Sequence, residues 1–551
     1  MKGSDQRERL FDAAESKTLG MCESSMRENR ETPGTPTPDG GAGRSEKAES
    51  RKSDMHVSGE SDGLIVPTKR ANKADAHRGM SPCAPAAETV EGRGSIKGNA
   101  AQQAVDRTQR RSTTSTGLWG VRQAASRDRK ARFTALLHHV TPELLQASFF
   151  ELKRQAAPGV DGVRWEEYRK GLERRIADLH GRVHRGTYRA KPSKRAWIAK
   201  ADGGERPLGI AALEDKIVQQ AVKSVLEQIF EVEFLGFSYG FRPGRSQHNA
   251  LDALWVGLTK RKVNWVLDAD IRGFFDAIDH EWLMKFIGHR IADRRVLRLI
   301  RKWLRAGVSE DGRWSKTVVG TAQGSVISPF LANVFLHYVL DLWVAQWRKQ
   351  NARGDAIVVR YADDFVMGFQ HRSDAERCLQ ELRGRLEKFG LELHPEKTRL
   401  IEFGRYAAER RSKAGLGKPE TFSFLGFTHY CGRTRKGAFT IKRQSVAKRM
   451  RAKLAEIKAQ LERHMHASVT EMGRWLRSVV QGWLTYHAIP GNSPCLDSFR
   501  TQVGRIWLSV LRRRSQKGRR WCWEYMARLI RRWLPPTQIL HPYPDQRLTV
   551  T

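Results

Sequence analysis

The chain has 551 residues, with 98 Lys plus Arg against 60 Asp plus Glu, so its formal net charge at pH 7 is +38. A chain of this length has room for roughly three or four domains. Its charge argues against a neutral enzyme of small metabolites and points to a polyanionic partner, either nucleic acid or an anionic membrane surface.

The positive charge lies almost wholly beyond the first 118 residues. Residues 1–118 carry 19 basic and 17 acidic side chains, so the remaining 433 residues carry +36. This first stretch has one aromatic residue, Phe11, whereas all 16 Trp residues follow it. A Ser-, Gly- and Pro-rich segment with so little apolar surface cannot offset its chain entropy. We therefore expect residues 1–117 to be disordered and the charge to belong to the folded part.

Membrane and secretion signals are not expected. The N-terminal residues are charged and lack an apolar signal-peptide core. The six Cys residues are scattered without a C-x-x-C pair, which argues against a disulfide framework and a zinc site. We expect a cytoplasmic protein with free thiols.

The ordered chain begins near residue 118 with helical patterns at 130–137 and 144–152, the second preceded by Thr141 and Pro142 as a start signal. Paired apolar residues between 215 and 234 predict a helix with a buried face. Residues 329–347 predict a long apolar helix, and 441–464, 469–486 and 499–533 predict basic helices.

Two predicted strands carry acids at their ends. Residues 263–271 form an apolar run that reaches Asp270, and residues 356–367 form an apolar run interrupted by Asp363 and Asp364, which suggests a hairpin. Carboxylates at the edge of a core are costly unless a cation compensates them. Three such acids brought together could hold two divalent metals, which activate a 3′-hydroxyl and stabilise a pyrophosphate leaving group. Oxygen ligands favour Mg²⁺, so phosphoryl transfer on nucleic acid is the leading class.

The same residues resemble a known family. Tyr361-Ala362-Asp363-Asp364 is similar to the Y-x-D-D box of reverse transcriptases, and residues 269–276 are similar to their first catalytic strand. More specifically, the chain resembles bacterial group II intron-encoded reverse transcriptases and maturases, because further motifs of that family follow in the same order along the sequence. The further matching motifs are residues 158–162, 206–210, 239–246, 323–329, 393–398 and 424–427.

The resemblance implies an α+β fold: a right-hand polymerase with fingers and an antiparallel palm sheet, followed by a helical thumb and a basic helical module. The expected divisions are a disordered extension at 1–117, fingers and palm at 118–430, a maturase or thumb (X) domain at 431–498, and a nucleic-acid-binding module at 499–551. The resemblance implies no endonuclease domain, because no paired Cys residues follow the basic helical module.

The resemblance also assigns roles at the catalytic centre. Asp270, Asp363 and Asp364 would be catalytic and bind two Mg²⁺ ions, with the backbone carbonyl of Ile271 completing the metal site. Phe275 would stack under the nucleotide sugar and exclude a ribose 2′-hydroxyl, with core filler as the alternative.

Further nucleotide contacts follow in the same way. Gln323 would lie near the sugar and base of the incoming nucleotide, with a plain turn residue as the alternative. Lys200 and Arg206 flank a Gly turn and would clamp the triphosphate, with exposed solvated charges as the alternative. Lys397 matches a lysine sometimes assigned as general acid to the leaving pyrophosphate, an assignment left open.

The end of the chain combines Arg and Lys with interleaved Trp and Tyr, which favours a nucleic-acid-binding helical module over a solvated charge run. The candidate nucleic-acid-binding residues are Arg512, Arg513, Arg514, Lys517, Arg519 and Arg520.

The predicted function is an RNA-directed DNA polymerase that also folds its own intron RNA for splicing and supports retrohoming by target-primed cDNA synthesis. The expected partners are group II intron RNA, a DNA target and primer, and dNTPs, with no membrane and no obligate protein partner, in a nucleoid-associated ribonucleoprotein. The alternatives are another reverse transcriptase lineage (retron, diversity-generating or CRISPR-associated) and a splicing-only maturase that binds RNA without polymerase activity.

Overall fold

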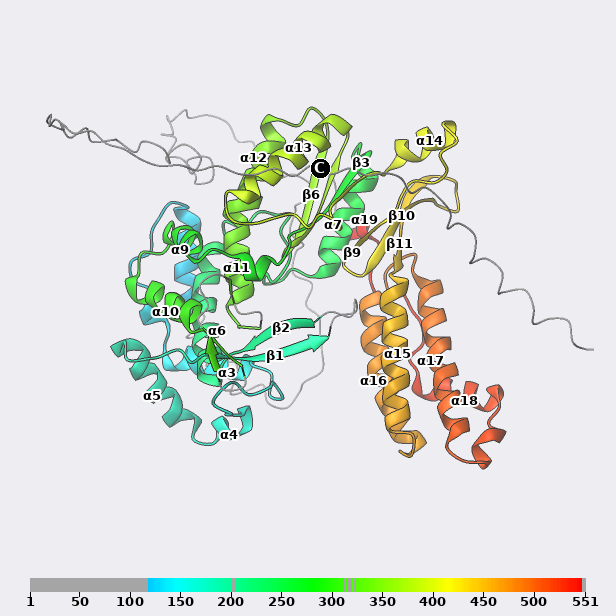
Figure 1. The fold of residues 1–551 in the computed structure, drawn as a ribbon, viewed down its shortest axis with the longest axis horizontal. Helices are drawn as coiled ribbons and strands as arrows, with labels where there is room; N and C mark the ends of the chain where they lie inside the picture. Colours follow the sequence, from blue (N-terminus) through cyan, green and yellow to red (C-terminus); the bar gives the residue numbers. More distant parts are fainter. Residues whose placement is uncertain (1–116, 200–204, 311–312, 316–319, 322–323, 548–551) are drawn as a thin grey trace, which may run out of the picture. The chain divides into compact units, whose positions relative to one another are not determined.

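The structure is a computed structural model that describes residues 117–547 except 200–204, 311–312, 316–319 and 322–323. All of these residues belong to one unit of the chain, Ser58–Thr551. The expected disordered extension, residues 1–117, lies outside the described residues apart from residue 117. Helices and mostly antiparallel sheets are both present (Figure 1), which confirms the predicted α+β class.

The first described part is helical. Residues 117–127 form a helix, followed by the short 3-10 turn η2 (Leu137–His139) and by α3 (Pro142–Glu151), which Thr141 caps by accepting a hydrogen bond from the amide of Leu144. The helix expected at 130–137 is wrong. The amide of Phe133 donates instead to the carbonyl of Arg290 at 2.7 Å, so a distant segment holds this stretch extended.

Two further helices and a small sheet follow. The helices are α4 (Trp165–Arg169) and α5 (Leu172–Arg185). The sheet has the order β2-β1-β4-β5. Its strands are β1 (Ser193–Ala199), β2 (Glu205–Ile210), β4 (Val308–Glu310) and β5 (Arg313–Ser315). The antiparallel strands β1 and β2 lie on the two sides of the Gly turn that the sequence predicts between Lys200 and Arg206.

The central sheet has the order β6-β7-β3-β8, and all of its pairs are antiparallel. Its strands are β3 (Trp265–Asp270), β6 (Ala356–Tyr361), β7 (Asp364–Phe369) and β8 (Arg399–Glu402). The predicted hairpin is confirmed as β6–β7. Successive residues of a strand point to opposite faces of its sheet. Val266 and Leu267 belong to different apolar clusters, so both faces of this sheet are covered.

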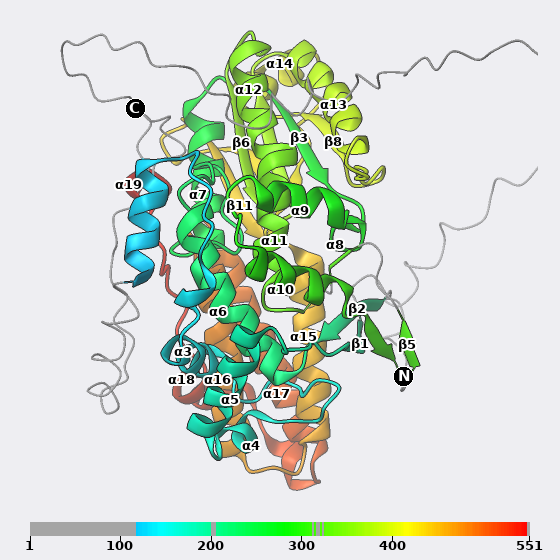
Figure 2. The ribbon, with the colours of Figure 1, turned by 90° about the vertical axis from the view of Figure 1, so that its left-hand side faces the viewer.

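Helices pack on the two faces of the central sheet. One face meets the long helix after residue 328 together with α13 (Arg372–Glu387), and the other meets α7 (Gln247–Lys260). The buried helix predicted at 215–234 is α6 (Leu213–Phe230), and Figure 2 shows it below α11. The remaining helices of this region are α8 (Phe274–Ala277), α9 (His280–Gly288), α10 (Arg294–Arg305) and α14 (Arg405–Lys413).

The long apolar helix is interrupted in its middle. It consists of α11 (Ser328–Leu336), the π-helical segment η3 (His337–Asp341) and α12 (Leu342–Gln350). Among the described residues, Ser328–Gln350 is the one helix long and apolar enough to cross a membrane by length and composition. Its most apolar window is 78% buried inside the protein, as the core helix of a globular fold would be.

A three-stranded sheet follows the central one, in the order β11-β10-β9. Its strands are β9 (Phe422–Phe424), β10 (Phe427–Arg433) and β11 (Phe439–Ser445). The helix predicted from residue 441 is therefore wrong at its start, because residues 441–445 pair with β10 and the helix α15 (Ala447–Arg463) begins only afterwards.

The last helices form a bundle around one apolar core (Figure 1). The elements are α15, α16 (Val469–His487), α17 (Ser493–Arg513), the 3-10 turn η4 (Lys517–Arg520) and α18 (Trp523–Trp533), whereas the short α19 (Pro544–Arg547) packs against α7. Helices on both sides of residue 498 share this core, and the division expected at 430–431 falls inside β10. The boundaries given above as domain limits stay a prediction.

Candidate active site

The β6–β7 hairpin carries two of the predicted catalytic acids at its turn. Tyr361 pairs with Asp364, so Ala362 and Asp363 are the two turn residues. Ala362 has a φ of +58°, the left-handed conformation that two-residue hairpin turns require. A residue with a side chain in this conformation is strained, and such strain is typical of functional sites.

The third predicted acid lies directly across the sheet. Asp270, the last residue of β3, is the register partner of Asp364. Directly opposed residues on antiparallel strands have Cβ atoms about 4.5–5.5 Å apart. The structure thus brings the end of β3 and the β6–β7 turn to one edge of the central sheet, although about 90 residues separate them in the sequence.

The electrostatics of Asp364 show how crowded this edge is. Burial, reinforced by the negative charges of Asp268, Asp270 and Asp363, raises the pKa of the Asp364 carboxyl to about 8. Arg449 of α15 opposes the effect. A carboxylate in this position needs a compensating positive charge to remain ionised at neutral pH.

Asp268 is a member of this cluster that the sequence analysis missed. It lies two residues before Asp270 on β3 and so on the same face of the strand. Burial raises the pKa of Asp268 to about 6, while Arg399, 3.8 Å away, lowers it and Asp270 raises it. The signal was present in the alternation Asp268-Ala269-Asp270, in which two acids share one face.

The chemistry of the cluster suits a divalent cation. Carboxylate oxygens are the hard ligands that Mg²⁺ prefers, and a cation would relieve the repulsion among the acids. Among the described residues, however, no three His, Cys, Asp or Glu side chains are grouped closely enough to form a metal cluster. The residues fit a cation by donor type and by their position on the sheet.

Lys397 reaches the same edge from the chain before β8. Its Nζ lies 2.7 Å from Oδ2 of Asp270, and its side chain is 61% exposed. The lysine thus contacts one of the predicted catalytic acids. Its assignment as a general acid stays a prediction.

The loop after β3 carries the next two predicted residues. Ile271 is buried and forms an isolated antiparallel bridge with Leu393. Phe275 is partly buried and packs edge-on against Phe274, with ring centroids 5.4 Å apart. Part of the Phe275 side chain thus packs in the core, as the core-filler alternative predicted, and part remains accessible to solvent.

The loop that contains Gln323 is anchored near Phe275. The amide of Thr321 donates to the carbonyl of Phe275 at 2.7 Å, and a side chain at Gly324 would come within 3.0 Å of the carbonyl oxygen of Gly209 in β2. Gln323, Lys200 and the side chain of Arg206 lie outside the described residues. The residues beside Gln323 nevertheless contact β2 through Gly209 and α8 through Phe275.

Gln219 of α6 is a second residue that the sequence analysis missed. Its buried Oε1 accepts hydrogen bonds from Oγ of Ser325 at 2.8 Å and from the amide of Val326 at 3.2 Å. A buried polar side chain must find partners, and here it fixes the turn after Gln323. Its sequence signal was a glutamine among the apolar residues of a buried helix.

A buried ion pair supports the hairpin turn from below. Arg360 of β6 donates to both carboxylate oxygens of Asp341, at 2.7 and 2.6 Å, and both side chains are fully buried. The same guanidinium donates to the carbonyl of Ala362 at 2.9 Å and to Oδ1 of Asn333 at 3.1 Å. Asp341 lies in the π-helical segment, a distortion that is frequent at functional sites.

The segment 237–243 packs against the other side of the turn. The amide of Tyr239 donates to the carbonyl of Arg360 at 2.9 Å, and a side chain at Gly240 would overlap the amide nitrogen of Ala362. Glycine is required at this point because backbone meets backbone. Residue Ser238 of this segment forms an isolated parallel bridge with Arg360 at the edge of β6.

Three of the predicted C-terminal basic residues are bound within the fold. Arg512–Arg514 donate hydrogen bonds to the carbonyl of Trp521, the carboxylate of Glu462 and the carbonyl of His466, at 2.8, 3.0 and 3.3 Å respectively. These contacts fasten the end of α17 to the bundle.

The other predicted basic residues lie in η4. Arg519 and Arg520 are exposed, and the side chain of Lys517 lies outside the described residues. A nucleic-acid role for all six residues stays a prediction.

Comparison with known proteins agrees with this geometry. A family model described as reverse transcriptase (RNA-dependent DNA polymerase) matches residues 198–429, which include all three predicted catalytic acids. Protein YkfC of Escherichia coli strain K12 is 33% identical over 332 residues, which make up 53% of this chain and 87% of YkfC.

Two intron-associated proteins are also similar. The group II intron-encoded protein LtrA of Lactococcus lactis subsp. cremoris is 36% identical over 223 residues, or 40% of this chain and 36% of LtrA. A 91 kDa protein in the cob intron of Schizosaccharomyces pombe is 34% identical over 222 residues, or 39% of this chain and 27% of that protein. The chain thus spans about a third of the length of LtrA.

The matched family implies a right-hand polymerase fold, with the central sheet as its palm. The paired acids of β3 and β7, the reverse transcriptase match and the similarity to intron-encoded proteins lead to one assignment. This chain belongs to the family of group II intron-encoded reverse transcriptases and maturases.

Proposed function

We propose that this protein is an RNA-directed DNA polymerase that extends a DNA primer with dNTPs on an RNA template. The pairing of Asp270 with Asp364 across β3 and β7, beside Asp363 in the hairpin turn, is the observation that carries the proposal. Two strands whose acidic ends meet at one edge of the sheet supply the anionic metal ligands that a nucleotidyl transfer site needs.

The carboxylates of Asp270, Asp363 and Asp364, with the backbone carbonyl of Ile271, would hold two Mg²⁺ ions. When bound, such ions activate the primer 3′-hydroxyl and neutralise charge on the departing pyrophosphate. The chain's own residues have separate tasks: Arg360 holds the hairpin turn by its bond to the carbonyl of Ala362.

Further residues would bind and select the nucleotide. The accessible part of Phe275 would lie under the sugar and exclude a 2′-hydroxyl, and Gln323 would contact the sugar and base. Lys200 and Arg206 would grip the triphosphate by charge-assisted hydrogen bonds. Lys397, whose Nζ contacts Asp270, would supply a proton to the pyrophosphate.

We further propose that the protein binds and folds its own group II intron RNA for splicing and supports retrohoming by target-primed cDNA synthesis. The similarity to LtrA and to a protein in a cob intron supports this assignment. The helical bundle and its exposed Arg519 and Arg520 would contribute phosphate contacts.

The polymerase is tested with purified protein, Mg²⁺, an RNA template, a DNA primer and dNTPs. Wild-type protein should make cDNA, and Asp363→Ala should abolish synthesis because a metal ligand is lost. Glu387→Ala removes an exposed carboxylate from the end of α13 and should leave the rate unchanged. Absence of cDNA from the wild type would refute the polymerase assignment.

Maturase function is tested with the same variant. Asp363→Ala should still promote splicing of the cognate intron, because folding of the RNA does not require the catalytic metals. Loss of splicing in this variant, with its thermal stability unchanged, would contradict the separation of the two functions.

A further inference from the structure

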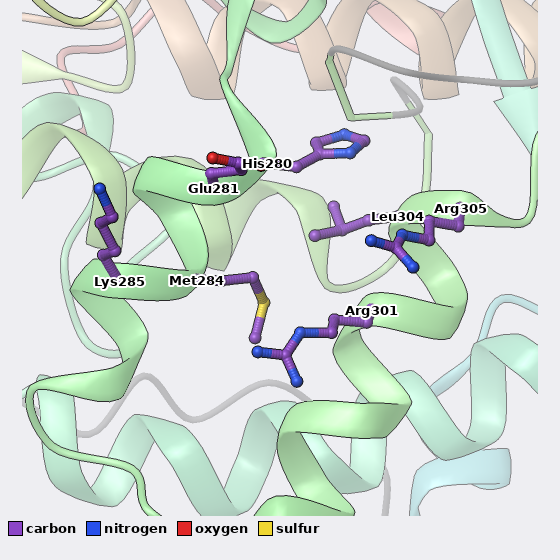
Figure 3. A pocket seen from close by; sticks show the side chains of 7 residues that line it. All are labelled: His280, Glu281, Met284, Lys285, Arg301, Leu304 and Arg305. Atoms are coloured by element: carbon purple, nitrogen blue, oxygen red, sulfur yellow. The ribbon is translucent and has the colours of Figure 1, made fainter. Parts of the chain in front are cut away.

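A cationic cavity lies between α9 and α10, outside the proposed catalytic residues. Its volume is about 360 Å³, and Figure 3 shows the seven side chains that line it. Arg301 and Arg305 point from α10 into the space that faces α9, and Met284 points into it from α9. None of the polymerase residues proposed above lines this cavity.

The sequence of α10 explains why its cations face outward. Val296, Leu299, Ile300 and Leu304 are buried and form the core face of the helix. The exposed positions Arg294, Arg298, Arg301 and Arg305 recur at helical spacing and therefore share the opposite side.

The two arginines of the cavity differ from the other cations of α10 in their contacts. Elsewhere on α10, Arg295 lies 3.6 Å from Asp293, and Lys302 donates to the carbonyls of Gly186 and Tyr188. Arg301 and Arg305 have no ion pair with any carboxylate in the described part of the chain. Two guanidinium groups in one cavity without an anionic partner are preorganised to bind an anion.

The α9 side adds an apolar surface and one further cation. Met284 lies between the two helices, and Lys285 stands over the ring of Trp282, 4.3 Å from its centroid. Glu281 is the one acid among the lining residues, and it is exposed. A cavity lined by guanidinium groups and by the apolar side chains of Met284 and Leu304 suits a phosphate attached to an organic group better than a free inorganic ion.

His280 connects this cavity to the nucleotide site. Its Nε2 hydrogen-bonds the carbonyl of Gly320, and the amide of Gly320 donates to the carbonyl of Ile278 at 2.9 Å. The next residue, Thr321, is bonded to Phe275. The cavity therefore adjoins the loop that leads to Gln323.

We propose that this cavity binds the phosphodiester backbone of single-stranded RNA. Arg298, Arg301 and Arg305 extend over about 10 Å of helix at 1.5 Å per residue, a span longer than one phosphate and suited to a strand. The location beside the nucleotide loop makes the RNA template the strand that would pass here. The choice of template rests on the proposed polymerase function, whereas the binding of RNA phosphates does not.

The test measures binding of a short fluorescein-labelled single-stranded RNA at several salt concentrations. For single strands, each phosphate contact contributes about 0.7 to the slope of log K against log salt concentration. Arg301→Ala combined with Arg305→Ala should weaken binding at low salt and reduce the slope by about 1.4, the loss of two contacts.

Three variants make the result specific. Arg383→Ala with Lys388→Ala removes two exposed cations from the region of α13 and should leave slope and affinity unchanged. The lysine pair, Arg301→Lys with Arg305→Lys, should show the wild-type slope, because it keeps the two positive charges that the alanine pair removes. Glu281→Gln removes the one lining acid and should tighten RNA binding.

The outcomes separate this site from the polymerase proposal. If the alanine pair binds RNA with the wild-type slope, or if the control pair loses as much, the cavity is not a phosphate site, whatever the polymerase assay shows. If wild-type protein makes no cDNA yet the alanine pair loses slope, the cavity stands and the polymerase proposal fails. Crosslinking of 4-thiouridine RNA should recover peptides from α9 or α10 in the wild type and lose them in the alanine pair.

Discussion

Arg360 is a fully buried cation directly below the turn that carries Asp363. Its forked contact with Asp341 and its bond to the carbonyl of Ala362 join the long core helix to the β6–β7 hairpin. A buried ion pair adds little net stability compared with well-packed apolar residues, so such a pair suggests a positioning role.

Removing one partner of this pair should be costly. Arg360→Ala leaves Asp341 buried without its cation, and we expect a loss of about 3–5 kcal/mol in the free energy of unfolding, measured by urea denaturation. Arg360→Met with Asp341→Leu removes both charges and should recover most of that stability. We expect kcat for cDNA synthesis to remain low in the double variant, because the turn has lost its hydrogen bond. Full recovery of kcat would show that Arg360 supports only the fold.

His429 of β10 is expected to contribute to the acid sensitivity of the protein. It is fully buried and stacks on Phe422 with ring centroids 4.9 Å apart, and burial, assisted by Arg443, lowers its pKa to about 3. The unfolded chain takes up this proton below pH about 6.5, whereas the folded protein does so only near pH 3. In between, the unfolded state binds more protons, so stability falls as pH falls.

We expect His429→Phe to reduce this acid sensitivity while preserving the ring stack. Between pH 7.5 and pH 5 the wild type should lose about 2 kcal/mol more stability than the variant, since each pH unit below 6.5 contributes about 1.4 kcal/mol. Denaturant unfolding at the two pH values measures the difference. His337, whose pKa burial lowers to about 4, acts in the same direction and should keep part of the slope in both proteins. Equal pH slopes would show that His429 does not titrate this way.

At the scale of elements, α16 shows how glycines define helix packing. A side chain at Gly473 would come within 2.6 Å of Cγ of Trp533 in α18, whereas one at Gly482 on the same helix would meet nothing within 4 Å. The two glycines have the same backbone preference and differ only in what they face.

Gly473→Ala should therefore lower the melting temperature, with a loss of about 1–3 kcal/mol from overpacking against the indole. Gly482→Ala should raise it slightly, since alanine is favoured over glycine in a helix by up to about 1 kcal/mol. Thermal unfolding of both variants gives the comparison. Similar shifts in both would mean that contact with Trp533 does not limit the approach of α16 and α18.

The local spacing of apolar residues predicted some helices and strands correctly and others wrongly, and the reasons can be identified. The β6–β7 hairpin was predicted because its apolar residues and acid turn are contiguous in the sequence. Residues 441–445 read as helix but pair with β10, since a strand partner outweighs a weak local preference. The π-helical turn at 337–341 was not predicted from the local sequence, and its Asp341 meets its partner Arg360 only across the core.

The same distinction applies to the candidate site. Asp270, Asp363 and Asp364 were predicted from acids at the ends of apolar strands and from their resemblance to a family. Asp268 was missed, because its importance depends on the charges around it and not on its own sequence context. Gln219 was missed for a similar reason, since its partners lie about 105 residues away.

At the scale of the whole molecule, the chain returns on itself after its last long helix. The amides of Leu540 and His541 donate to the carbonyl of Ala488, and the ring of His541 stacks on His248 of α7 with centroids 3.7 Å apart. The end of the helical part thus contacts a helix that packs on the central sheet. No pattern in the sequence of residues 535–547 indicated this contact.

The large positive charge also acquires a distribution in three dimensions. Some of the cations, such as Arg360, Arg443 and Arg512, are bound within the fold. Others, such as Arg301 and Arg305, have no described anionic partner and face a cavity. Composition counts the two kinds equally, and only their surroundings separate a structural cation from one available to bind phosphate.

The sequence by itself determined the polyanionic partner, the acidic strand ends and the family, because charge, apolar runs and contiguous motifs are properties of neighbouring residues. The tertiary structure decided which acids meet at one sheet edge, which arginine is buried beneath them and where a cationic cavity forms. Those outcomes depend on pairing and packing between segments about 90 or more residues apart, such as β3 with β7. Long-range contacts of this kind arise from burial and hydrogen-bond satisfaction over the whole fold, so no local pattern contains them.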